Sequence, residues 1–392
     1  MTVEAPDRPA APRAQGGEPD ISVVMPCLNE AGSVGDCVRK AGEWIRGAGL
    51  TGEIIVVDNG STDGSPEAAE QAGAQVIHET RRGYGSAYLA GFGAARGRVV
   101  VMGDSDGTYD FANLDPLVQP LDDGFDMVVG NRFDGGIQPG AMPVLHRHIG
   151  TPILSRLLKV VTGTPVDDSQ SGFRAITRTA LQQMALKSTG MELASEMILK
   201  AEQRSMRVTE VPVEYAARVG ESKLKTWSDG WRHLRFLLVH SPNHLFLIPG
   251  LVMAVLGGIV MLLALLQLNV IGRTWGIHAE IAGALFVIVG VQVVSLGLCA
   301  HAYGMYFMGE RDPWFDRMRA RFRLEHGLAL GGVTTLIGFL VAAIIVGQWI
   351  SRGFGELGEE RLAILAATLI IIGIQTFFSS FLLSIIGLRR ER

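Results

Sequence analysis

The sequence has little of several features that mark other classes of protein. Only three cysteines occur among 392 residues, and Cys27, Cys37 and Cys299 show no pairing pattern or CxxC spacing. We therefore expect free thiols in a reducing compartment and no disulfide framework. The net charge of -4 lacks the positive excess that a general nucleic-acid binder usually carries.

Two nucleotide-binding patterns and a secretion signal are also missing. No G-x-G-x-x-G follows the first expected strand, and no P-loop lysine occurs, which argues against a Rossmann dinucleotide site and against an ATPase. Residues 1–19 are rich in Ala, Pro, Gly and charge, without an apolar core long enough for a signal peptide. We expect a disordered tail there, followed by a domain that stays in the cytoplasm.

Apolar residues are abundant in the last third of the chain. Up to about Trp231 the composition is that of a soluble α/β protein, and beyond Leu245 it is overwhelmingly apolar. Four stretches reach the roughly 20 residues that a membrane-spanning helix needs. They cover residues 245–268, 281–303, 328–350 and 362–388. The alternative is that these stretches are buried helices of a large soluble core. Four successive apolar stretches with charge only between them argue against this alternative.

The charges between these spans predict their orientation. Arginines are concentrated in the loop between the second and third spans and after the last span. The other two loops carry fewer cations, which glutamates partly offset. The first cluster is Arg311, Arg317, Arg319, Arg321 and Arg323, and the second is Arg389, Arg390 and Arg392. The positive-inside rule places both termini and the large domain in the cytoplasm, in an integral protein of the plasma membrane. Whether the spans only anchor the chain or shape a groove for a lipid stays open, and Gly257, Gly258, Gly331 and Gly332 permit close helix packing.

Cations alternate with aromatic residues just before the first span. Lys223 and the arginines that follow it are interleaved with Trp227, Trp231 and Phe236. This pattern suits a helix lying in the lipid headgroup layer, with a plain linker helix as the alternative. The expected organisation is therefore a tail (1–19), a catalytic domain (20–222), a juxtamembrane helix (223–243) and an all-α membrane domain of four helices (244–392).

Short apolar strands alternate with helical segments in the domain before the spans. Strands are expected at 21–26, 53–58, 75–78, 98–104 and 126–130, with helices at 33–47, 66–72, 86–95 and near residue 114. Such alternation predicts a mostly parallel sheet with helices on both faces. Ligands of these sheets bind at the carboxyl ends of the strands, where the chain places Glu30, Asp58 and the pair Asp104 and Asp106.

The aspartate pair closes the buried strand Arg98-Val-Val-Val-Met-Gly-Asp-Ser-Asp. Side chains two residues apart on an extended chain point the same way, so Asp104 and Asp106 are expected to face one site with Ser105 turned away. Two carboxylates in this position suit a Mg²⁺ or Mn²⁺ ion that carries a diphosphate. A solvated Asp-rich turn is the alternative for an isolated Asp-x-Asp.

Four motifs together carry a family resemblance. They are Pro26-Cys-Leu-Asn-Glu, Val57-Asp-Asn-Gly-Ser-Thr-Asp-Gly, Gly103-Asp-Ser-Asp and Gln170-Ser-Gly-Phe-Arg. In this order they resemble the inverting family 2 glycosyltransferases of GT-A fold. Within that family the chain is most similar to the polyprenyl-phosphate (dolichol-phosphate) hexose synthases, which move a sugar from a UDP- or GDP-hexose to the phosphate of a membrane polyprenol.

The resemblance implies roles for individual residues. Pro26, Glu30, Asp58 and Asp104 would bind the nucleotide-sugar donor, and Asp106 would be the main metal ligand, with Asp104 beside it. The catalytic set would be Asp104, Asp106 and Asp168, with Asp168 orienting the attack or the sugar hydroxyls. Arg132, Arg174 and Lys223 would bind the acceptor phosphate or the diphosphate, and Arg218 is a further candidate. A surface cation paired with a nearby acid is the alternative for each of these basic residues.

One departure from the family pattern concerns the metal site. Many relatives carry a Gln two residues after the second metal-binding Asp, where this chain has Thr108, whose hydroxyl reaches less far. The Gln-x-x-Arg-Trp motif of processive polysaccharide synthases is absent, which favours a single transfer. Glucose and mannose are the leading sugars, and the oligomeric state stays open. The alternatives are transfer to a lipid or glycan hydroxyl, which needs a carboxylate base, and a non-catalytic scaffold or transporter.

Overall fold

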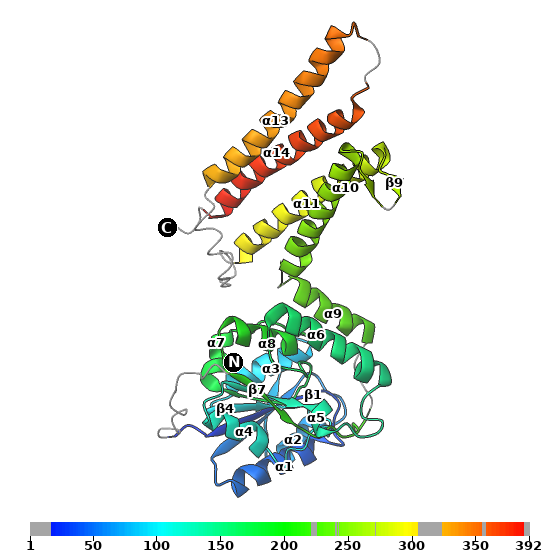
Figure 1. Ribbon diagram of the computed structural model, residues 1–392. Coiled ribbons are helices and arrows are strands. Elements are labelled where there is room, and N and C mark those ends of the chain that lie inside the picture. Colours follow the sequence, from blue (N-terminus) through cyan, green and yellow to red (C-terminus); the bar gives the residue numbers. More distant parts are fainter. Residues whose placement is uncertain are drawn as a thin grey trace. The chain divides into compact units, whose positions relative to one another are not determined.

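The computed structural model describes residues 17–220, 226–239, 241, 243–270, 272–304, 324–354 and 358–387. The chain divides into two compact units, Met1–Leu237 and Leu238–Arg392 (Figure 1). Several sequence expectations fall outside the described residues: most of the N-terminal tail, Lys223, and both arginine clusters that set the expected membrane orientation.

The first unit is built on a seven-stranded sheet. Its strands lie in the order β3-β2-β1-β4-β6-β5-β7. Their bounds are β1 (Ile21–Cys27), β2 (Gly52–Asp58), β3 (Gln75–His78), β4 (Val99–Met102), β5 (Met127–Asn131), β6 (Arg174–Thr177) and β7 (Val208–Pro212). Strand β6 runs antiparallel to both β4 and β5, and all other neighbouring pairs are parallel. The expectation of a mostly parallel α/β sheet is therefore confirmed.

Helices cover both faces of this sheet (Figure 1). Helices α1 (Val34–Gly47), α2 (Ser65–Gln71) and α4 (Asp115–Asp122) lie on one face, and α3 (Tyr84–Ala94), α6 (Thr151–Thr162), α7 (Arg178–Met184) and α8 (Leu193–Gln203) lie on the other. Two short helices, α5 (Arg132–Gly135) and the π-helix η1 (His146–Gly150), complete the unit before β6.

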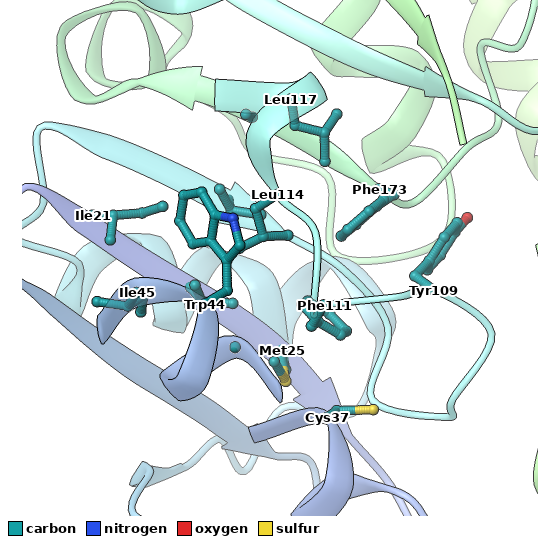
Figure 2. Close-up of a cluster of buried hydrophobic side chains, with 14 of the residues drawn as sticks. Ile21, Met25, Cys37, Trp44, Ile45, Tyr109, Phe111, Leu114, Leu117 and Phe173 are labelled. Atoms are coloured by element: carbon teal, nitrogen blue, oxygen red, sulfur yellow. The ribbon is translucent and has the colours of Figure 1, made fainter. Parts of the chain in front are cut away.

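Each face of the sheet has its own apolar core. Along β1, Val23 and Met25 belong to the core that contains α1 and α4, whereas Val24 belongs to the core on the opposite face. Figure 2 shows the first of these cores, in which Trp44 and Leu114 pack over the strands. Strands buried on both faces read as continuous apolar runs, which is why their positions could be predicted from the sequence.

Strand β4 is shorter than expected. It ends at Met102, whereas the sequence predicted a strand that continues to Asp104. Met102 pairs with Val24 of β1 on one side and with Arg174 of β6 on the other, and both ladders stop there. The aspartate pair therefore lies in the turn that follows the strand, and the alternation of an extended chain does not set its orientation.

The juxtamembrane helix α9 covers Thr226–Val239. His233 is buried, and its Nδ1 lies 3.1 Å from the hydroxyl of Ser195 on α8. Phe236 packs against the core that contains α3 and α8. Trp231 and Arg232 on the same helix are exposed. One face of α9 is thus fixed on the first unit.

The second unit consists of long apolar helices. They are α10 (Ile248–Leu265), preceded by the π-helix η2 (Asn243–Leu247), α11 (Ile277–Tyr303), α13 (Leu324–Ser351) and α14 (Glu360–Gly387), with a short hairpin of β8 (Asn269–Val270) and β9 (Arg273–Thr274). Among the described residues, four segments are long and apolar enough to span a membrane: Asn243–Leu265, Ile277–Tyr303, Glu325–Ser351 and Glu360–Ile386. They coincide with the four spans predicted from the sequence.

Glycines allow close backbone approach in two pairs of these helices, α10 with α11 and α13 with α14. A Cβ at Gly257 on α10 would lie 2.6 Å from the carbonyl oxygen of Gly283 on α11. A Cβ at Gly331 on α13 would lie 2.7 Å from the carbonyl oxygen of Gly373 on α14. Small residues allow such backbone approach between membrane helices. Gly258 and Gly332 have open space instead, so only half of the expected packing glycines serve this purpose.

Candidate active site

A pocket of about 320 Å³ opens at the carboxyl ends of β1, β2 and β4. Its wall is formed by the segments that follow these strands, by residues 82–87, 190–191 and 215–218, and by α9. The charged residues that line it are Glu30, Arg82, Asp104, Asp106, Arg218 and Arg232. This edge of a parallel sheet is where the strands leave room for ligands. The sequence-predicted residues Pro26, Glu30, Asp104 and Asp106 are thus brought together in one pocket.

Asp104 is held by two tyrosine hydroxyls from α3. Tyr84 donates to its Oδ1 over 3.0 Å and Tyr88 donates to the same oxygen over 3.4 Å. Burial, together with the negative charge of Asp106, raises the pKa of Asp104 to about 7. A Cβ at Gly172 would lie 2.9 Å from Asp104 Oδ2, so the glycine of the Ser-Gly-Phe-Arg segment leaves space beside the carboxylate.

Asp106 is oriented by its own turn. Its Oδ1 accepts hydrogen bonds from the backbone N–H of Thr108 over 3.1 Å and from the Thr108 hydroxyl over 2.6 Å. Thr108 stands where many relatives have glutamine, and its short side chain positions the Asp106 carboxylate by a direct hydrogen bond. Asp106 Oδ2 lies 3.4 Å from an Nη of Arg218.

Arg218 links two acidic residues of the pocket. Its guanidinium forms a salt bridge with Glu30 as well as with Asp106. The chain around Arg218 runs beside the aspartate turn, because Val219 N–H donates to the carbonyl of Asp106 over 3.1 Å and Ala216 N–H donates to that of Thr108 over 2.9 Å. These backbone hydrogen bonds explain how a residue distant in sequence becomes part of the site.

The donor set fits a divalent cation that also binds a ligand. Both aspartates line the pocket, and in each the hydrogen bonds from neighbouring hydroxyls fall on Oδ1. Among the described residues no cluster of three or more His, Cys, Asp or Glu side chains is arranged to hold a metal. Mg²⁺ commonly uses one or two carboxylates and completes its coordination with phosphate oxygens and water. The pair Asp104 and Asp106 matches that mode, and a closed structural metal site does not.

Asp58 lies beside the pocket and does not belong to its lining. Its carboxylate accepts hydrogen bonds from the backbone N–H groups of Gly60 (3.2 Å) and Ser61 (2.9 Å) and lies 3.2 Å from His78 Nδ1. The next residue, Asn59, does line the pocket. Asn59 Oδ1 accepts from Gly83 N–H over 2.8 Å, which fastens the loop that carries Arg82 and Tyr84.

Arg132 and Asp168 pair with each other in the interior. The guanidinium Nε and Nη2 of Arg132 donate to the two carboxylate oxygens of Asp168 over 2.7 and 2.8 Å, and both residues are buried. The Arg132 guanidinium also lies 5.2 Å from the ring centroid of Tyr215, which lines the pocket. The pair therefore stands one residue behind the pocket wall, and neither member belongs to the lining.

Arg174 is completely buried. It donates to the backbone carbonyls of Ser171, Ala194 and Ser169 over 2.9, 2.9 and 2.7 Å. Burial lowers its pKa from the usual value. The structure thus does not bring Arg174 to the pocket, and its contacts connect the Ser-Gly-Phe-Arg segment to α8. Lys223, the remaining predicted cation, lies outside the described residues.

Comparison with known proteins gives the family of the chain. Residues 22–185 match the model described as glycosyl transferase family 2, and residues 298–387 match the C-terminal transmembrane region of family 2 glycosyltransferases. The low-salt glycan biosynthesis hexosyltransferase Agl6 of Haloferax volcanii is 39% identical over 94% of this chain and 89% of its own length. The chain belongs to the family 2 glycosyltransferases. The GT-A fold expected from its motifs is confirmed, and the chain is an integral membrane glycosyltransferase.

Other relatives of this glycosyltransferase carry lipid-phosphate names. The dolichyl-phosphate hexose transferase of Haloferax volcanii is 34% identical over 54% of this chain and 89% of its own length. The undecaprenyl-phosphate 4-deoxy-4-formamido-L-arabinose transferase of an Enterobacter species is 26% identical over 80% of this chain and 95% of its own length. A solved structure, glucosyl-3-phosphoglycerate synthase from Mycobacterium tuberculosis, is similar with a TM-score of 0.46 and 22% identity, covering 57% of this chain and 80% of that one.

The sequence did not single out three side chains that the structure places in the pocket of this glycosyltransferase: Arg82, Tyr84 and Arg232. For the first two a signal existed, because both lie in the Arg82-Gly-Tyr-Gly segment directly after β3. No signal in the sequence distinguished Arg232, because it is one of several cations on a helix expected to be amphipathic.

Proposed function

We propose that this glycosyltransferase moves a hexose from a UDP- or GDP-sugar to the phosphate of a membrane polyprenol, with inversion at the anomeric carbon. The observation that carries the proposal is the pocket at the sheet's carboxyl edge, where Asp104 and Asp106 stand with Arg82, Arg218 and Arg232 in a chain that also contains four apolar spans. Carboxylates for a metal-bound diphosphate and cations for phosphate groups occur together there.

The donor is held on the carboxylate side of the pocket. Pro26 and Glu30 contact the nucleotide part, and Asp58 supports this region through the hydrogen bonds that shape the turn after β2. Asp104 and Asp106 would hold a Mg²⁺ or Mn²⁺ ion, which would supply positive charge against the negative charge that develops on the departing diphosphate.

The acceptor oxygen needs no proton removed before it attacks. A polyprenyl phosphate is ionised at neutral pH, so one of its oxygens forms the bond to the anomeric carbon while the bond to the diphosphate breaks and the nucleoside diphosphate leaves. The difficulty is the approach of two anions, which positively charged side chains reduce. Arg218 and the other arginines of the pocket supply that charge.

A hydroxyl acceptor is less well supported. Such an acceptor requires a general base within hydrogen-bonding reach. Asp168 was the candidate base, but both of its carboxylate oxygens accept hydrogen bonds from Arg132 and it does not line the pocket. Glu30, the other carboxylate of the described pocket besides the aspartate pair, forms a salt bridge with Arg218. These pairings favour an acceptor that arrives as an anion.

An exposed apolar stripe supports action at a lipid surface. Leu145, Ile149, Ile153 and Val160 follow one face of η1 and α6 and are 48%, 50%, 58% and 67% exposed. The opposite face of α6 is buried through Ser155 and Leu158. Exposed arginines beside the stripe, Arg147 and Arg156, complement anionic headgroups. The stripe would rest on the cytoplasmic leaflet, because the charges between the spans predict a cytoplasmic catalytic unit.

Transfer into a lipid product tests the proposal directly. The full chain, purified and reconstituted in nanodiscs, is given Mg²⁺ or Mn²⁺, decaprenyl or undecaprenyl phosphate, and a panel of radiolabelled UDP- and GDP-sugars. We expect label in the organic phase with one donor, only when both metal and lipid phosphate are present. Transfer to diacylglycerol or to a glycan, with none to lipid phosphate, would overturn the proposed acceptor. Donor binding without transfer to any acceptor would leave only a binding role.

A further inference from the structure

Three arginines line the pocket, and they come from three separate segments. Arg82 follows β3, Arg218 precedes α9, and Arg232 lies in α9 itself. Arg218 is already engaged with Glu30 and Asp106. Arg82 lies against the turn after β2, where a Cβ at Gly60 would be 2.9 Å from its Cζ. The structure gives Arg232 no carboxylate partner among the residues that it describes.

Arg232 has a fixed place in spite of its exposure. The next residue, His233, is buried against Ser195 of α8, and Phe236, one helical turn further on, packs into the core below. The backbone at Arg232 is therefore held by two contacts in the helical turn that follows it. A long side chain on a docked helix loses less freedom when it binds a ligand than one on a loose loop, which favours binding.

The position of α9 in the chain indicates which ligand Arg232 meets. The helix ends at Val239, and the first membrane-spanning segment begins at Asn243. Of the segments that line the pocket, α9 lies nearest in the sequence to a membrane-spanning segment. Arg232 therefore has the shortest chain connection to the bilayer, where a lipid headgroup is held, whereas a nucleotide arrives from solvent.

We propose that Arg232 binds the phosphate of the lipid acceptor and holds it beside the donor. The inference rests on the proposed function and adds a residue and an entry side to it. A guanidinium donates two parallel hydrogen bonds to phosphate oxygens, and this geometry fixes the phosphate as well as attracting it. Arg218, by contrast, stays with the carboxylates on the donor side.

The neighbouring arginine supplies a matched control. Arg235 lies on the same helix, is also exposed, and does not line the pocket. Arg232→Gln and Arg235→Gln therefore remove the same charge from the same helix, and only the first removes it from the pocket. In nanodiscs we expect Arg232→Gln to raise the KM for polyprenyl phosphate at least about tenfold, the loss of one or two charged hydrogen bonds. The KM for the donor should stay within about twofold, and Arg235→Gln should change neither value.

Two further measurements make the outcome decisive. Arg232→Lys keeps the charge without the paired donors, so it should recover part of the affinity for the acceptor. Binding of a short prenyl phosphate, measured by calorimetry without donor, should weaken in Arg232→Gln and not in Arg235→Gln. Equal behaviour of the two glutamine variants, or a rise confined to the donor KM, would overturn the inference while the wild-type transfer still stands. Absence of wild-type transfer to any lipid phosphate would overturn both the proposed function and the inference.

Discussion

Arg132 and Asp168 form a bidentate salt bridge in the interior of the catalytic unit, with N–O distances of 2.7 and 2.8 Å. The backbone N–H of Arg132 donates to the same carboxylate over 3.1 Å, and Glu210 accepts from the backbone N–H of Asp168 over 2.7 Å. The pair thus connects the end of β5 with the segment before β6 and supports Tyr215 in the pocket wall. The sequence had instead suggested separate roles, with Arg132 binding the acceptor phosphate or the diphosphate and Asp168 orienting the attack or the sugar hydroxyls.

Replacing one member of this pair should destabilise the chain. Arg132→Ala leaves the Asp168 carboxylate buried and uncompensated, a change that typically costs about 3–5 kcal/mol. We expect a clear drop in the apparent melting temperature of the catalytic unit, measured on the full chain in detergent. Arg132→Met combined with Asp168→Leu, which removes both charges, should regain much of this loss. An Arg132→Ala protein with wild-type stability and a raised acceptor KM would instead support the direct acceptor contact.

Thr108 should influence metal binding without being a ligand itself. Thr108→Val removes the hydroxyl that holds Asp106 Oδ1 and keeps the shape of the side chain. Loss of such an orienting partner commonly weakens metal affinity about 10–100-fold. We expect a higher Mn²⁺ concentration for half-maximal transfer, recovery of the rate at excess Mn²⁺, and weaker Mn²⁺ binding by electron paramagnetic resonance. Asp106→Ala should not recover at any metal concentration. Unchanged metal dependence in Thr108→Val would contradict this role.

The strands of the parallel part could be predicted because their burial is visible in the sequence. Val99 to Met102 is apolar at every position since helices cover both faces of the sheet. Strand β6 has only four residues and begins with Arg174. It is formed by antiparallel pairing with β4 and β5, which are distant in the sequence. No local pattern encodes that pairing, so the antiparallel insertion could not be foreseen.

In the site, too, some residues could be predicted from local sequence motifs, whereas others depend on contacts between segments that are distant in the sequence. Asp104, Asp106 and Glu30 follow strands whose carboxyl ends meet at one edge, so the sequence places them together. The choice of partner among charged residues is a property of the folded chain. Arg218 lies in the pocket because the backbone beside it pairs with the aspartate turn. Arg174, which was an equally plausible phosphate-binding residue from the sequence, is buried and donates to backbone carbonyls instead.

Glu196 should make the catalytic unit sensitive to acid. Burial alone would raise its pKa, but the Lys200 ammonium and the backbone N–H groups of Lys187 and Ser188 outweigh that effect and hold the pKa below its ordinary value of 4.5. Because the folded-state pKa is depressed, the stabilisation is present above pH 4.5 and is lost as the pH falls through the folded value. Glu196→Gln should therefore lower the melting temperature at pH 7 and flatten its decline below pH 4.5.

A control on the same helix separates this effect from a general loss of charge. Burial raises the pKa of Glu202, so the ionised form of this side chain does not stabilise the folded state. Glu202→Gln should leave the melting temperature at pH 7 unchanged or slightly higher. If both variants lost stability equally at pH 7, the hydrogen bonds to the 187–190 loop would not be the cause. That loop carries Gly190 and leads to Met191, and both residues line the pocket, so Glu196→Gln should also raise the KM for the donor.

The apolar stripe on η1 and α6 should matter for a membrane-bound acceptor alone. Ile153→Glu puts a charge in the middle of the stripe, at a side chain that is 58% exposed and therefore contributes little to the protein core. We expect weaker use of long-chain polyprenyl phosphate in nanodiscs, with unchanged use of a short prenyl phosphate in solution and an unchanged melting temperature. Glu70→Lys on α2, an exposed change on the opposite face of the sheet, should affect neither substrate. Equal losses with the long and the short acceptor would mean that the stripe serves folding or catalysis and does not contact lipid, whereas a change of oligomeric state in Ile153→Glu would identify the stripe as a contact between copies of the chain.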